Sequence, residues 1–188
     1  EIGVRLVGSE MCIRDRLSRT QDKKERAYLI NHFLDQFKGT VYRQTMFAEF
    51  ELEMGRMSEE GQALTADVLC EKYKELNELY YGPDMVCDEG IALEWARIPH
   101  FYNAFYVYKY ATGIISAMAI VDRILKEGAP AVKDYFAFLS SGSSDNPVNL
   151  LKIAGVDLTK TAAFDNAMNV FKAVSYTHLR AHETDSYL

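Results

Sequence analysis

The sequence predicts an all-α protein, and three observations carry this prediction. Apolar residues recur at spacings of three to five along most of the chain, as they do on one face of an α-helix. No segment shows the strict alternation of apolar and polar residues that is typical of a half-buried strand. Glycine and proline, 11 and 4 of 188 residues, fall mainly between the periodic segments and mark where helices end.

The first periodic segment, 22–56, predicts one long helix. Gly39 interrupts its apolar stripe, at a cost of about 1 kcal/mol relative to alanine in a helix interior. A glycine at this point predicts either close packing against a neighbour or a break in the helix. The apolar stripe consists of Tyr28, Leu29, Phe33, Phe37, Val41, Thr45 and Phe50.

The second helix is expected at 65–81, after a polar connector at 57–63. Thr65 is the predicted N-cap, and Gly82-Pro83 is the predicted stop. The next helix is expected at 91–98, opened by Asp88 or Glu89 and closed by Pro99. The remaining helices are expected from within 100–110 to 126, at 131–139, from 147 to about 155, and at 161–174.

Composition excludes several classes of protein. The net charge of −6 argues against a nucleic-acid surface, which needs clustered Lys and Arg. The longest apolar stretch, 113–121, is far shorter than the roughly 20 residues that a membrane span requires. Three widely spaced cysteines form neither a disulfide framework nor a zinc ligand set, so a reducing, cytoplasmic compartment is expected.

The two ends, 1–16 and 175–188, resemble translated sequencing-adapter read-through. The first shows no helical stripe, and the second interrupts an amphipathic helix, so we expect 17–174 to be the native segment. His178 and His182 in the last segment are spaced like zinc ligands. Glu183 follows them instead of lying between them, as a metallopeptidase motif requires, so no metal site is predicted there.

The richest set of chemically useful side chains lies in one eleven-residue stretch. It holds one imidazole and four phenols: His100, Tyr102, Tyr106, Tyr108 and Tyr110. Such groups can donate hydrogen bonds to an oxyanion that develops on a carbonyl. If the stretch is helical, Tyr102, Tyr106 and Tyr110 share one face. The alternative is that the aromatic residues are core and the histidine is an ordinary turn residue.

A second candidate is acidic. Glu49 and Glu53 share a helix face, as the ligands of a dinuclear metal site would. Such sites also need Glu-x-x-His pairs, and 17–174 contains none. A solvated acidic face is therefore the prediction for these glutamates.

Four stretches carry a resemblance to a known family: Tyr28–Glu51, Leu79–Asp84, Glu94–Gly113 and Phe138–Leu158. Together they resemble the C-terminal part of oligoendopeptidase F, within the thimet-oligopeptidase-like (M3) family of zinc metallopeptidases. The resemblance covers essentially all of 17–174. It implies the C-terminal, multi-helix portion of a larger helical catalytic domain that surrounds a deep channel.

The resemblance also implies a function. Members of the family hydrolyse internal bonds of short peptides, with zinc held by an H-E-x-x-H helix and a Glu on the next helix. No H-E-x-x-H occurs in this chain. In the family these ligands precede the matched region, so no residue here is expected to bind zinc. The implied partners are short peptides and the missing N-terminal and catalytic-helix part of the same protein, and the chain alone is expected to be inactive.

The resemblance gives the tyrosine-rich stretch a role in stabilising the tetrahedral intermediate. His100 matches the family's histidine by order, and Tyr102, Tyr106 and Tyr108 are the candidate phenols. Larger relatives have a glycine-containing loop after this histidine, whereas no glycine lies between His100 and Tyr110. The individual tyrosines therefore stay open. A non-catalytic, all-α module that binds peptides or proteins is the alternative function.

Overall fold

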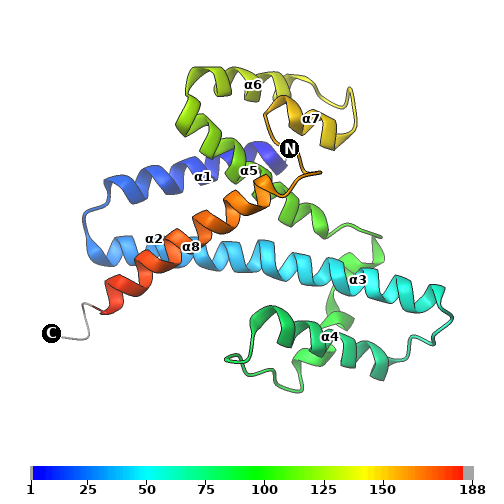
Figure 1. Cartoon of the computed structure of the whole chain (residues 1–188). Coiled ribbons are helices and arrows are strands. Elements are labelled where there is room, and N and C mark those ends of the chain that lie inside the picture. Colours follow the sequence, from blue (N-terminus) through cyan, green and yellow to red (C-terminus); the bar gives the residue numbers. More distant parts are fainter. Residues whose placement is uncertain (1, 184–188) are drawn as a thin grey trace. The chain divides into compact units, whose positions relative to one another are not determined.

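The computed structural model describes the backbone of residues 2–183 and the side chains of residues 7–176. The described part of the chain is helical and contains no strand, which confirms the predicted fold class (Figure 1). The α-helices are α1 (Ile2–Arg19), α2 (Lys23–Phe37), α3 (Arg43–Glu59), α4 (Ala66–Tyr81), α5 (Tyr108–Glu127), α6 (Ala129–Ser140), α7 (Pro147–Ile153) and α8 (Ala162–Glu183). A π-helical turn, η1 (Lys38–Tyr42), and two 3₁₀ helices, η2 (Ile91–Arg97) and η3 (Pro99–Tyr102), complete the elements.

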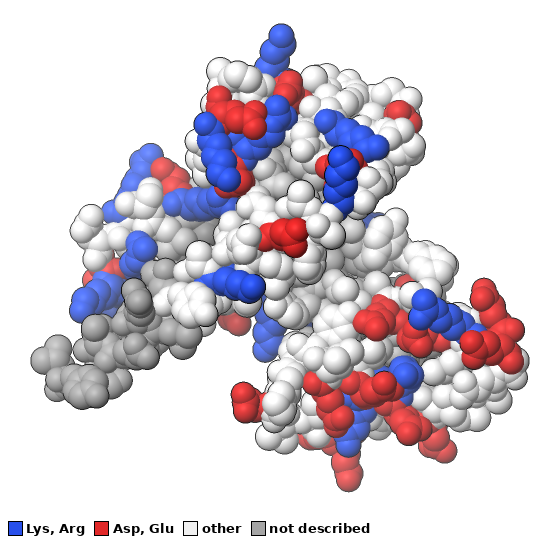
Figure 2. Space-filling view, in the orientation of Figure 1, with Lys and Arg blue, Asp and Glu red and all other residues white. Residues whose placement is uncertain are grey.

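The chain divides into two compact units. The first unit comprises Glu1–Lys38 and Thr112–Leu188, and the second comprises Gly39–Ala111. The second unit contains 13 acidic residues (Asp and Glu) and 6 basic residues (Lys and Arg). Acidic side chains gather over the part of the chain that contains α4 (Figure 2). The acidic balance of the sequence therefore belongs to the second unit.

The first unit is built by packing of amphipathic helices. Helix α2 packs against α8 and α1, and α6 packs against α7. Phe37 of α2 is fully buried and stacks on Phe171 of α8, with 4.5 Å between the ring centroids. The buried apolar face of α5 in this unit comprises Ile114, Ile115, Ala117, Met118, Ile120 and Val121.

The second unit has a more aromatic core. Helices α3 and α4 pack together, and η2 packs against α4. The ring of Phe50 meets that of Tyr73 edge-on, with centroids 5.1 Å apart. The buried cluster consists of Met46, Phe47, Phe50, Leu69, Tyr73, Leu76 and Val107.

Local signals in the sequence place several helix ends correctly. The Thr65 side chain accepts a hydrogen bond from the backbone N–H of Val68, and Gly82 ends α4 with a φ of 79°. The Asp88 carboxylate accepts the backbone N–H of Ile91, the first residue of η2, at 2.9 Å, although the N-cap position itself is Gly90. Element η2 is a 3₁₀ helix.

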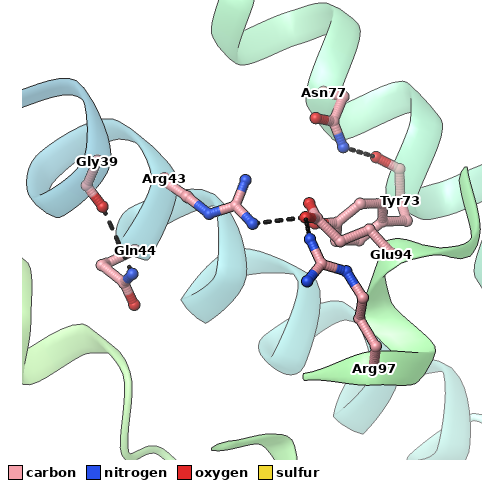
Figure 3. Close-up of polar contacts among 7 residues, drawn as sticks. All are labelled: Gly39, Arg43, Gln44, Tyr73, Asn77, Glu94 and Arg97. Atoms are coloured by element: carbon pink, nitrogen blue, oxygen red, sulfur yellow. Dashed lines mark hydrogen bonds and ion pairs between the residues drawn. The ribbon is translucent and has the colours of Figure 1, made fainter. Parts of the chain in front are cut away.

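Gly39 marks a break and not a close approach. A Cβ added there would meet no atom within 4 Å, so tight packing is not its role. The glycine lies instead in η1, where one turn widens to the π form between α2 and α3. The side-chain amide of Gln44 donates a hydrogen bond of 3.4 Å to the carbonyl of Gly39 (Figure 3). Such single π turns are frequent at functional sites.

The first segment differs from its prediction. Residues 1–16 were expected to lack a helical stripe, yet most of them form α1, and this expectation was wrong. Val7, Glu10 and Ile13 are buried at a helical spacing. Because Glu10 is charged, a search for apolar residues alone does not detect this buried stripe.

At the C-terminal end, α8 continues past residue 174. The side chains of His178, His182 and Glu183 lie outside the described residues. No helix of the described chain is long and apolar enough to cross a membrane.

Candidate functional site

The tyrosine-rich stretch is not one helix. Pro99 begins η3, which ends at Tyr102, and Asn103 then adopts an extended conformation. Phe105 follows with a φ of 54°, and α5 begins at Tyr108. Because the helix is broken, Tyr102 does not share a helix face with Tyr106 and Tyr110, and that conditional expectation is not met.

The break brings three side chains together. The His100 ring lies 5.4 Å from that of Tyr106 and 6.4 Å from that of Tyr110, centroid to centroid. The Tyr110 hydroxyl donates to the Tyr106 oxygen at 3.1 Å. His100 is exposed, and both tyrosines are half-buried. We call His100, Tyr106 and Tyr110 the His–Tyr cluster.

Two of the predicted site residues lie outside this cluster. Tyr102 is 89% exposed, and Tyr108 is 51% exposed. Tyr110, which was not among the predicted site residues, lies in the cluster. Its spacing of four residues from Tyr106 was the signal for this pair, because such residues are neighbours on one face where the chain enters a helix.

The cluster has an asymmetric electrostatic environment. The Lys109 ammonium lies 3.4 Å from the centroid of the Tyr106 ring. The hydrogen bond from Tyr110 and the charge of Lys109 lower the pKa of Tyr106. The pKa of Tyr110 is raised, chiefly because its hydroxyl donates to Tyr106. A phenol with a lowered pKa is the stronger hydrogen-bond donor, so Tyr106 is the better equipped of the two to stabilise a developing negative charge.

A buried ionic network supports the start of this stretch (Figure 3). Glu94 of η2 is 7% exposed. Its Oε1 accepts hydrogen bonds from Arg43 at 2.6 Å and from Arg97 at 2.5 Å, and its Oε2 accepts one from the Tyr73 hydroxyl at 2.7 Å. Burial alone would raise the pKa of Glu94, but the hydrogen bonds from Arg43, Tyr73 and Arg97 outweigh it, so the pKa is lowered. Glu94 is therefore a buried, fully partnered carboxylate.

The network ties η2 to two helices of the second unit. Arg43 comes from α3 and Tyr73 from α4, and burial together with donation to Glu94 raises the pKa of Tyr73. The fully buried Asn77 donates its amide to the Tyr73 carbonyl at 2.9 Å. Because η3 and His100 follow η2 directly, fixing η2 also fixes the start of the site. Sequence reasoning missed this network, since Arg43 and Glu94 are 51 residues apart.

The acidic face of α3 is not simply solvated, and the prediction was wrong for Glu49. The Tyr80 hydroxyl donates to the Glu49 carboxylate at 2.5 Å. Glu51 Oε1 accepts the backbone N–H of Phe105, also at 2.5 Å. Glu53 behaves as expected, since it pairs with Arg56 at the surface. Two of the three carboxylates therefore contact other elements.

No metal ligand set is present in the described residues. No group of three or more His, Cys, Asp or Glu is arranged there to hold a metal ion. The described residues therefore do not fit a zinc ion.

Comparison with known proteins places this helical arrangement among the peptidases. The chain is 49% identical over 156 residues to "Oligopeptidase PepF" of Bacillus subtilis and 41% identical over the same length to "Oligoendopeptidase F, chromosomal" of Lactococcus lactis. The sequence model described as peptidase family M3 matches residues 9–170. The chain belongs to peptidase family M3, and the resemblance to oligoendopeptidase F is confirmed.

These matches cover most of this chain but only part of each relative. They cover 83% of this chain but only 23% and 26% of the two relatives, so the chain spans about a quarter of their length. The crystal structure of oligoendopeptidase-F from Enterococcus faecium superposes with a TM-score of 0.92 at 41% identity. That match covers 95% of this chain and 34% of the other. The family match begins at residue 9, inside the segment 1–16.

Proposed function

We propose that this chain is the C-terminal helical part of a zinc-dependent oligoendopeptidase that hydrolyses internal bonds of short peptides. Membership of peptidase family M3 and 49% identity to an oligopeptidase support the reaction class. The His–Tyr cluster is the observation that carries the proposed role of this part. It places an exposed imidazole next to a phenol whose pKa is lowered.

His100 and Tyr106 act together as hydrogen-bond donors to the oxyanion of the tetrahedral intermediate. Their rings are 5.4 Å apart, so one carbonyl oxygen can approach both. Tyr110 orients the Tyr106 phenol through the 3.1 Å hydrogen bond between them. The exposed Tyr102 and Tyr108 contribute to the wall that contacts the peptide. Donors fixed in advance at the position of developing charge give a large catalytic effect.

The metal centre belongs to the remainder of the parent enzyme. This chain supplies the oxyanion donors and part of the substrate channel, and a zinc ion held by residues outside it would activate the attacking water. The chain alone is inactive, because its described residues offer no metal ligand set. The three cysteines are all free, in keeping with a cytoplasmic location.

A chimeric enzyme tests this proposal directly. In Bacillus subtilis oligopeptidase PepF, the segment matched by this chain is replaced with residues 17–174, and hydrolysis of an internally quenched peptide is measured. We expect activity that a chelator abolishes and zinc restores. A folded chimera that binds the peptide but does not cleave it contradicts the proposal and favours the non-catalytic module.

His100→Ala in that chimera is expected to lower kcat by about 10²- to 10³-fold, as loss of an oxyanion donor does. Tyr106→Phe removes the second donor with little change in volume and should also lower kcat. Tyr28→Phe is the matched control, because Tyr28 is exposed and the site does not include it. An unchanged kcat in His100→Ala rules out its role as a donor.

We also propose that residues 17–174 are native and that 1–16 and 175–188 are not. Glu10 is buried with its Oε2 unpaired among the described residues, as is one guanidinium nitrogen of Arg14. Sequencing of the genomic region around the gene tests this, since codons for 1–16 and 175–188 found in frame at that locus would contradict it.

A further inference from the structure

We propose that Glu51 is a positioning residue, which holds the loop at Phe105 in the conformation that brings Tyr106 to His100. The inference rests on the proposed function for its catalytic consequence. Its structural part stands on the geometry of the second unit alone.

The loop needs an external support, because its backbone is strained. Phe105 is the one non-glycine residue of the described chain with a positive φ, 54°. Such a conformation costs on the order of 1–3 kcal/mol and persists only where the surroundings impose it. The Phe105 ring is 60% exposed, so burial of the side chain does not hold the backbone in place.

The Glu51 carboxylate supplies that support. Its Oε1 accepts the Phe105 N–H at 2.5 Å across 54 residues of sequence. Hydrogen bonds to an ionised acceptor are roughly twice as strong as neutral ones. Inside the loop, Asn103 N–H donates to the His100 carbonyl at 3.0 Å and Tyr106 N–H to the Asn103 carbonyl at 3.1 Å. These two turns shape the loop, and Glu51 anchors it to α3.

The anchor carries an energetic cost, which argues against a role in packing alone. Glu51 follows Phe50 in α3, which is fully buried in the aromatic core. The second carboxylate oxygen, Oε2, is buried and has no hydrogen-bond partner in the described structure. Burying an unpaired carboxylate oxygen is unfavourable. A strong acceptor aimed at Phe105 N–H accounts for a glutamate at this position despite that cost.

The position of the anchored peptide explains its effect on the site. Phe105 immediately precedes Tyr106 in the chain. If the Phe105 backbone loses its hydrogen bond to Glu51, the Tyr106 ring moves away from the His100 ring and from the Lys109 ammonium. Displacing a catalytic group by about 1 Å costs on the order of 10²-fold in rate. Glu51 therefore acts on the reaction through Tyr106, without touching the substrate.

The first experiment is structural and uses the 188-residue chain. The Tyr106 ring shields the Lys109 side chain, so its ε-methylene protons should resonate upfield in NMR spectra. We expect Glu51→Ala to return them toward the free-lysine position and Glu51→Gln, which keeps an acceptor, to retain most of the shift. Glu53→Ala is the matched control on the same helix and should change nothing. An unchanged Lys109 shift in Glu51→Ala overturns the proposal.

The second experiment uses the active chimera. Glu51→Ala should lower kcat by about 10- to 100-fold with KM within about twofold, and Glu51→Gln should fall between it and the parent. Adding Phe105→Gly to Glu51→Ala should recover part of the loss, because glycine adopts a positive φ without strain. A general structural defect would not be rescued by glycine at this one position, so absence of rescue overturns the proposal.

The two proposals fail in different ways. If His100→Ala leaves kcat unchanged, the proposed function of the cluster is wrong, while the Lys109 shift still decides whether Glu51 positions the loop. If His100→Ala lowers kcat and Glu51→Ala does not, the function stands and the positioning role is wrong.

Discussion

Each of the two units buries a carboxylate, and the two carboxylates are in opposite situations. In the second unit Glu94 is 7% exposed and accepts hydrogen bonds from Arg43, Arg97 and Tyr73. In the first unit Glu10 of α1 is 2% exposed, and its Oε2 has no partner among the described atoms. Partners lower the pKa of Glu94, whereas burial, only partly offset by Arg14, raises the pKa of Glu10.

The difference teaches that burial of charge is not by itself a sign of function or of stability. Taking a carboxylate out of water costs several kcal/mol, and only well-placed partners return that free energy. Around Glu94 three donors from three elements do so, and the network fixes the elements that lead to His100. Around Glu10 the compensation is incomplete. A substitution should therefore destabilise the protein at one residue and stabilise it at the other.

Glu94→Ala gives the largest expected effect, a loss of about 3–5 kcal/mol in the free energy of unfolding of the second unit. The substitution leaves Arg43 half-buried without its carboxylate and Tyr73 fully buried without an acceptor. Urea unfolding, with hydrogen exchange in α4 as the local probe, measures this loss.

Arg97→Ala is the control for that variant. The Arg97 side chain is 73% exposed, and exposed ion pairs contribute about 1 kcal/mol or less. A loss in Arg97→Ala as large as that in Glu94→Ala would show that the buried pair is not the source of the stability.

Glu10→Leu should act in the opposite direction and stabilise the first unit by about 1–2 kcal/mol at pH 7. The substitution removes a buried, incompletely paired carboxylate and adds apolar contact in the same position. Thermal unfolding measures the gain. Asp15→Leu, an exposed change in the same helix, should stay within about 0.5 kcal/mol of the parent. A destabilised Glu10→Leu variant would show that the Glu10 charge is satisfied in solution.

The sequence predicted those parts of the fold that depend on neighbouring residues. The Thr65 cap and the Gly82 stop act within a few positions of the helix that they bound, so the pattern placed α4 to the residue. The sequence pattern did not predict helix α1, because the charged Glu10 lies on its buried face and interrupts the apolar pattern there.

The candidate site was only partly predictable, for the same reason. His100 and Tyr106 followed from composition and from the family resemblance, and the structure brings them together. The roles of Glu94 and Glu51 depend on contacts across 51 and 54 residues. No local sequence pattern predicts a phenylalanine with a positive φ, so the loop that separates Tyr102 from Tyr106 and Tyr110 could be found only in the three-dimensional structure.

The pH dependence of stability separates the two carboxylates by sign, with a smaller effect than either substitution. The pKa of Glu94 is lowered in the folded protein, so its contribution is present above the unfolded value of about 4.5 and is lost as the pH falls through the folded pKa. The pKa of Glu10 is raised, so its penalty is absent at low pH and grows as the pH rises from 4.5 through the folded pKa. Free energies of unfolding measured between pH 3 and 7 should therefore fall less steeply toward acid in Glu94→Gln than in the parent. In Glu10→Gln the fall toward acid should be steeper, because the variant no longer carries a penalty that protonation relieves. Equal slopes in all three proteins would mean that neither carboxylate is perturbed, and the contrast between the units would then rest on packing alone.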